Sequence, residues 1–209
     1  MPSTRGVYFA WAMQGLILLE GIYGLIILNP SIIFTAFIGF FLTCIPYLIE
    51  RRVRVTLPWE VNFLIAFAVF LHVAGYSQHL YLFLYPYYDK FAHFISSITV
   101  AVLAFVSILL INRFSCTKLA RWQIFFYIVI FTMAIGSFWE IYEYLMDTFF
   151  GSHLTKLLQH SLDDTMIDLI TDLLGGIVVA AFGTWYIQKK TLDELTDQMV
   201  DESTPECEL

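Results

Sequence analysis

Six long apolar segments, separated by short polar stretches, dominate the hydrophobic pattern of this chain. They run over residues 7–28, 31–49, 61–82, 91–112, 123–146 and 165–187. Each is close to the roughly 20 residues that an α-helix needs to cross a bilayer. The pattern therefore predicts an all-α fold, a polytopic bundle of about six transmembrane helices.

The end of the third apolar segment departs from this pattern. Residues 76–88 are rich in tyrosine and contain His79, and ionisable groups are rare inside a membrane span. This stretch is therefore either the end of a helix or an interfacial or re-entrant segment.

The composition supports a membrane protein and argues against a large soluble core. The chain has 209 residues, of which 59% are hydrophobic and 14% are charged, whereas a soluble domain is about 45–50% apolar and about 25% charged. We expect residues 1–188 to form a single transmembrane domain. Residues 189–209 are strongly acidic and are predicted to be a disordered tail, which argues against nucleic acid as a partner.

Basic residues are divided unevenly between the two sides of the predicted bundle. With six spans, nine of the 11 Lys and Arg residues fall on the side that holds both termini. The other two, Lys90 and Lys156, fall on the opposite side. Because segments rich in Lys and Arg stay in the cytoplasm, both termini are predicted to be cytoplasmic in a multi-pass protein of the inner (plasma) membrane.

Acids and a histidine gather on the predicted outer side of the fourth and fifth segments. The fourth begins with Asp89, Lys90 and His93, and the acid and the histidine are four residues apart on one helix face. Near the end of the fifth, Glu140 and Glu143 are three residues apart and also share a face. His72 on the third segment falls in the same outer half of the bundle.

The start of the sixth segment adds a stripe of acids at a spacing of four residues. Asp164, Asp168 and Asp172 share one helix face. Gly175 and Gly176 follow, and they are small enough to let another helix approach closely. Ionisable side chains at membrane depth are costly, so they usually face a protein interior and mark a functional site.

Carboxylates far outnumber cations in this region, and their repulsion must be relieved by protonation or by a bound cation. Carboxylates with one or two imidazoles suit Mg²⁺, Mn²⁺, iron or Zn²⁺. The sequence therefore predicts a divalent metal site. Its candidate ligands are Asp89, His93, Glu143, Asp168 and Asp172.

Three further residues of the region are candidates for catalysis. Glu140 or Asp164 would act as a general base, because burial makes a carboxyl group a better proton acceptor. Lys90 would hold an anionic headgroup.

Several of these residues also have a structural interpretation. Asp89 and Asp163 are candidates to cap the fourth and sixth helices. In this interpretation, Lys90 has no role other than to neutralise Asp89 or Glu143. Glu140 and Glu143 then form structural ion pairs with Lys90.

The aromatic and loop residues nearby have ordinary interpretations. Trp139 and Tyr142 are expected to belong to the aromatic belt at the membrane interface. His153 and His160 are expected to be solvated in the outer loop.

Three motifs of this region resemble a known family. They are Asp89-Lys90-x-x-His93, Trp139-Glu140-x-x-Glu143 and Asp164-x-x-x-Asp168-x-x-x-Asp172. Together they resemble the YjdF-like inner-membrane family of bacteria and archaea over most of residues 61–187. They are more distantly similar to VanZ-like proteins, although this chain has Glu-x-x-Glu where those carry Glu-x-x-Gln. The resemblance implies a membrane protein of the cell envelope and supplies no reaction.

Three functions are open at this point. A metal-dependent hydrolase or transferase would act on a lipid or lipid-linked envelope substrate, with the metal activating water or polarising a phosphoryl or acyl group. A cation- or proton-coupled transporter would use the same acids, and a homo-oligomer would compensate for its small size. An accessory protein would use the acids only to join helices, at about 0.6–2 kcal/mol per contact. The apolar inner halves of the segments favour a one-sided site and therefore an enzyme.

The predicted orientation can be tested with the native cysteines. Cys116 and Cys207 are predicted to be cytoplasmic, whereas Cys44 lies within the second segment. In a Cys44→Ser background, a membrane-impermeant maleimide should label both remaining cysteines in inverted vesicles and neither in intact cells. A Ser152→Cys control in the predicted outer loop should show the opposite pattern. Labelling of Cys116 and Cys207 from outside would reverse the orientation.

Overall fold

The computed structural model describes residues 4–53, 55–115, 119–149, 158–189, 192–196 and 199–200. Its elements are helices, in the order α1 (Thr4–Ile26), α2 (Pro30–Val53), α3 (Trp59–Ser77), α4 (Leu80–Phe83), α5 (Tyr87–Ser115), α6 (Arg121–Phe149), α7 (Leu162–Tyr186) and α8 (Leu192–Thr196). Six of these helices are long and apolar enough to cross a membrane: α1, α2, α3, α5, α6 and α7. The predicted all-α membrane bundle is confirmed.

The third span ends earlier than the hydrophobic pattern predicts. Helix α3 stops at Ser77 and not near residue 82. His79 has a left-handed backbone with a φ of 57°, which interrupts the helix, and the short helix α4 follows. Residues 76–88, for which the sequence left two alternatives, thus begin with the end of α3 and continue into a separate short helix. Tyr81 of α4 is buried against the bundle.

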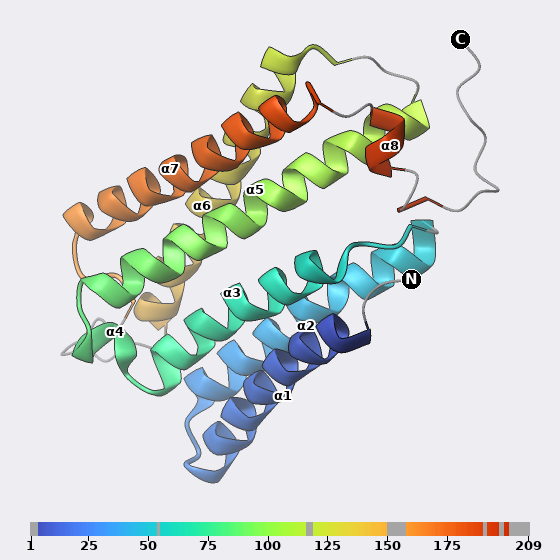
Figure 1. The fold of residues 1–209 in the computed structure, drawn as a ribbon. Coiled ribbons are helices and arrows are strands. Elements are labelled where there is room, and N and C mark those ends of the chain that lie inside the picture. The colour runs from blue at the N-terminus through green and yellow to red at the C-terminus, as the bar shows by residue number, and fades with distance from the viewer. Residues whose placement is uncertain are drawn as a thin grey trace.

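The six long helices form two groups (Figure 1). Helices α1, α2 and α3 pack against one another, and so do α5, α6 and α7. The two groups meet mainly where α3 packs against α5. Helix α4 and the starts of α5 and α7 lie at one end of the bundle, and the start of α1 lies with α8 at the other end (Figure 1).

Two glycines allow α7 to approach its neighbours, as the sequence predicted. A Cβ atom at Gly175 would overlap the side chain of Ser97 on α5. A Cβ atom at Gly176 would lie 3.2 Å from the Cβ of Thr132 on α6. The absence of side chains at these two positions fixes how closely α7 packs against α5 and α6.

Part of the acidic C-terminal segment packs against the bundle. Helix α8 contacts α5, Met199 is buried in an apolar cluster with Leu57 and Leu109, and Val200 pairs with Val55 in an antiparallel bridge. Leu195, Met199 and Val200 supply the apolar side chains of this contact. The remainder of residues 189–209 lies outside the described residues, and there the tail stays a prediction.

We predict that Gly175→Ala destabilises the protein by about 1–3 kcal/mol, because overpacking forces α5 and α7 apart. The unfolding midpoint in detergent should fall, whereas Leu174→Ala, at the exposed neighbouring position, should change it little. Ser97→Gly should restore part of the loss in the Gly175→Ala background. Equal midpoints for the two alanine variants would contradict the close contact.

Candidate functional site

The structure brings together all eight of the residues that the sequence singled out for the site. We call them the carboxylate cluster: Asp89, Lys90, His93, Glu140, Glu143, Asp164, Asp168 and Asp172. They come from the first half of α5, the second half of α6 and the first half of α7. All are buried except Lys90, whose side chain is 19% exposed. Lys90 therefore lies at the edge of the cluster.

Lys90 binds three of the six carboxylates. Its Nζ lies 2.9 Å from Asp89 Oδ2, 2.5 Å from Asp164 Oδ1 and 2.8 Å from Asp168 Oδ2. These are short charge-assisted hydrogen bonds. Among the described residues no ion pair joins Lys90 to Glu140 or Glu143, so the proposed structural pair with the glutamates is not formed.

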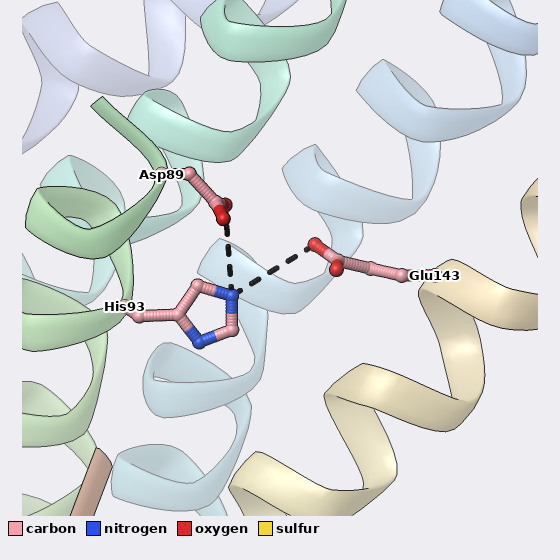
Figure 2. A group of neighbouring side chains, drawn as sticks. All are labelled: Asp89, His93 and Glu143. Carbon is pink, nitrogen blue, oxygen red and sulfur yellow. Dashed lines mark ion pairs between the residues drawn. The ribbon is translucent and has the colours of Figure 1, made fainter. Parts of the chain in front are cut away.

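A second part of the cluster surrounds His93. Its Nε2 lies 3.8 Å from Asp89 Oδ1, 3.7 Å from Glu140 Oε1 and 4.0 Å from Asp168 Oδ1. Glu143 Oε1 is also 4.0 Å away, and Figure 2 shows Asp89 and Glu143 converging on this nitrogen. These separations are too long for hydrogen bonds.

Four atoms around this point are buried and have no hydrogen-bond partner among the described residues. They are Asp89 Oδ1, His93 Nε2, Glu140 Oε1 and Asp168 Oδ1, and we call them the cage. An unsatisfied buried polar atom costs about 1–3 kcal/mol, and more if it is charged. Each of the three oxygens lies within 4.0 Å of the nitrogen, and a bound cation would satisfy such unpartnered atoms.

Asp172 contacts the other side of the histidine ring. Its Oδ1 is 3.4 Å from His93 Nδ1, so this nitrogen faces a carboxylate while Nε2 faces the cage. A carboxylate on the far nitrogen is the usual way to orient a metal-binding histidine. Gly136 on α6 makes the space for Asp172, because a Cβ at this position would overlap the Asp172 carboxylate.

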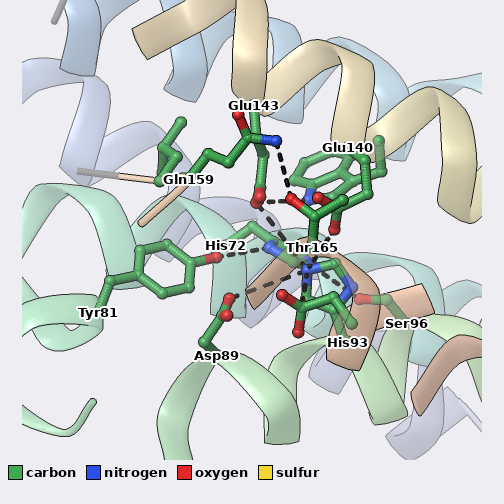
Figure 3. A network of polar contacts seen from close by, with 12 residues as sticks. His72, Tyr81, Asp89, His93, Ser96, Glu140, Glu143, Gln159 and Thr165 are labelled. Atoms are coloured by element: carbon green, nitrogen blue, oxygen red, sulfur yellow. Dashed lines mark hydrogen bonds and ion pairs between the residues drawn. The ribbon is translucent and has the colours of Figure 1, made fainter. Parts of the chain in front are cut away.

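A second histidine and its two hydrogen-bond partners line the cluster on the side of α3 (Figure 3). His72 Nδ1 is 2.6 Å from Tyr81 Oη, and its Nε2 is 3.0 Å from Ser96 Oγ. The His72 ring lies 5.6 Å from the His93 ring, centroid to centroid. Burial raises the pKa of the Tyr81 phenol well above its usual range, so this hydroxyl stays protonated.

Trp139 belongs to this site and not only to an interfacial belt. Its indole nitrogen donates to Glu143 Oε1 at 2.8 Å, and its ring lies 4.3 Å from that of His72. The four-residue spacing of Trp139 and Glu143 was the available signal. Tyr81 gave no such signal, because its position depends on the turn at His79.

The other acids and histidines of this end of the bundle have local roles. Asp147 accepts backbone hydrogen bonds from Leu158 and Gln159. The cap of α7 is Ser161, whose side chain accepts from the Asp164 backbone, so Asp163 does not cap this helix; it is exposed in the first turn.

The two loop histidines are only partly described. His160 Nδ1 lies 3.4 Å from Asp164 Oδ2, so it contacts the cluster and is not simply solvated. His153 lies outside the described residues.

Three overlapping groups of ligand atoms in the cluster are close enough to hold a metal ion. They are Asp89–His93–Glu143, His93–Glu140–Asp168 and Asp89–Asp164–Asp168. The third already surrounds the Lys90 ammonium, whereas the second consists of cage atoms alone. The cage is therefore the best candidate for a metal.

The chain matches the family described as "Predicted membrane protein (DUF2238)" over residues 9–189. It belongs to this family. A protein of Thermotoga maritima, described as "Uncharacterized protein", is 30% identical over 136 residues, which are 65% of this chain and 67% of that relative. No solved structure matches the chain. The family assignment supports the membrane class, and the YjdF-like and VanZ-like names stay resemblances.

We predict that Lys90→Met destabilises the protein by about 3–5 kcal/mol, because it leaves three buried carboxylates without their cation. The unfolding midpoint in detergent should fall strongly. Lys189→Met is the matched control, since the exposed Lys189 contacts only the face of the Trp185 ring among the interactions described for it. A similar midpoint for both variants would show that Lys90 does not neutralise the cluster.

Proposed function

We propose that this protein is a metal-dependent membrane hydrolase or transferase that acts on a lipid or lipid-linked substrate. The observation that carries the proposal is the cage: one imidazole nitrogen with three carboxylate oxygens 3.7–4.0 Å from it, all buried and without a hydrogen-bond partner among the described residues.

The dimensions of the cage are compatible with a divalent metal. Ligand bonds of about 2.0–2.2 Å at tetrahedral angles place ligand atoms roughly 3.3–3.6 Å apart. The distances of 3.7–4.0 Å from His93 Nε2 to the three oxygens need only small side-chain movements to reach this geometry. One imidazole with carboxylates suits Zn²⁺, iron or Mn²⁺ better than Mg²⁺, which prefers oxygen ligands.

The charge of the cluster supports the same conclusion. Six buried carboxylates face one lysine, and such an excess of negative charge is unstable in a low-dielectric interior. Lys90 neutralises one part of the cluster. A divalent cation in the cage would neutralise the other part.

The proposal gives four residues roles other than those assigned from the sequence, and two of them, Glu140 and Asp172, lie at the cage. Glu140 supplies a cage atom and acts as a ligand with Asp89, His93 and Asp168, whereas Asp172 orients His93 from behind. When bound, the metal would activate water or polarise the scissile group.

The remaining residues have roles at the edge of the cage. Glu143, held by Trp139, is placed to accept a proton as general base. Lys90 is partly exposed and would bind an anionic part of the substrate, and Asp164 holds Lys90 in place.

The apolar lining of the space beside the cluster, toward the middle of the bundle, supports an enzyme over a transporter. The space that continues from His93 and Asp172 toward the opposite end is lined mainly by apolar side chains, and an ion path would need polar groups there. In the orientation predicted from the basic residues, the site would open toward the outer leaflet.

Metal content tests the proposal directly. We expect about one divalent ion per chain in the protein purified in detergent, and its loss in Asp168→Asn, which removes a charged ligand. Asp163→Asn changes an exposed acid of the same helix and should retain the ion. Elemental analysis of the three proteins, with thermal unfolding as a check of folding, makes the comparison. A folded wild-type protein that takes up no metal on reconstitution would overturn the metal-enzyme proposal in favour of protonated acids.

A further inference from the structure

A cavity of about 150 Å³ adjoins the carboxylate cluster inside the bundle. Helices α3, α5, α6 and α7 all contribute to its lining. We infer that this cavity holds the first carbons of the hydrocarbon chain of the substrate, whose polar group lies at the cage. This inference rests on the proposed function and names its substrate class: an amphipathic molecule with an unbranched or isoprenoid chain.

The cavity and the cluster share residues, so one molecule can occupy both. His93 and Asp172 belong to the cluster and also line the cavity. His72 and Trp139, which contact His93 and Glu143, line it as well. A substrate whose polar group lies at the cage can therefore place its attached hydrocarbon chain directly in the cavity.

The body of the cavity is apolar. Its lining includes Ile65, Ala68, Val69, Val100, Leu103 and Ile135. A dry apolar cavity of about 150 Å³ is large enough for a benzene molecule, that is, for about six carbons. This volume suits the start of an acyl chain or a single isoprene unit.

The hydroxyl groups of the lining do not make the cavity polar. Ser97, Thr99 and Thr132 each donate to a backbone carbonyl of their own helix, at 2.8–2.9 Å. The fourth hydroxyl, on Ser96, bonds to His72. With these hydroxyls engaged, a hydrated ion or a sugar would find few partners, whereas a hydrocarbon needs none.

One residue of the cavity lining also lies at the outer surface of the bundle. Ile135 of α6 lines the cavity and keeps 38% of its own surface exposed. Among the described residues, α3 packs mainly against α1, α2 and α5, and α6 packs mainly against α5 and α7. The seam between α3 and α6 therefore has few close backbone contacts, and side chains such as His72 and Trp139 meet across it. A chain longer than six carbons would continue through this seam into the bilayer.

The test uses two hydroxamates, which carry the same metal-chelating group on hydrocarbon chains of different length. Acetohydroxamate has two carbons and hexanohydroxamate has six. Burial of one methylene strengthens binding roughly fourfold, and the probes differ by four methylenes. The metal-loaded wild-type protein should therefore bind the longer probe about 200-fold more tightly. Calorimetry in detergent measures both dissociation constants.

Two variants test whether the hydrocarbon chain of the longer probe binds in this cavity. Ala68→Leu fills the cavity and should reduce the ratio of the two dissociation constants below about tenfold, with little change for acetohydroxamate. Ala134→Leu places the same side chain on the exposed surface of α6 and should keep the wild-type ratio. The wild-type comparison is informative by itself if Ala68→Leu does not fold.

The outcomes separate this inference from the proposed function. Absence of metal from the wild-type protein would overturn the proposed function. Equal binding of both probes by the metal-loaded protein would overturn only the hydrocarbon site in the cavity. The same conclusion would follow if the ratio of the two dissociation constants were equal in Ala68→Leu and in the wild type.

Discussion

Burial of six carboxylates within the membrane-spanning helices is the constraint on which the rest of this structure depends. Each would be strongly disfavoured alone in a medium that solvates charge poorly. The three helices α5, α6 and α7 meet the constraint by turning all six toward one another. Lys90 compensates the part of the cluster that lies nearest the surface, and the unpartnered atoms around His93 leave a second, deeper demand for positive charge.

The sequence was sufficient to predict six spans and the residues that gather in the carboxylate cluster. Hydrophobic length determines the six helices, since a bilayer requires about 20 apolar residues whatever their order. Spacing determines which acids share a face, so Asp164, Asp168 and Asp172 could be placed together before any contact was known. All three are buried in the cluster.

The contacts that each residue makes inside the cluster could not be predicted in the same way. Whether Asp172 meets the cage or the back of His93, and whether Lys90 selects aspartates or glutamates, depends on the rotation and separation of neighbouring helices. Periodicity leaves both quantities undetermined. Tyr81 was missed for a different reason: it reaches His72 only because the chain reverses at His79, and hydropathy carries no trace of such a local turn.

Gly136 shows how a site can depend on a residue that has no functional group. It faces Asp172 across the contact between α6 and α7, and any side chain there would take the volume that the carboxylate occupies. The missing side chain at position 136 and the carboxylate at position 172 thus depend on the same volume between the two helices. A larger group at either position would therefore require a compensating change at the other.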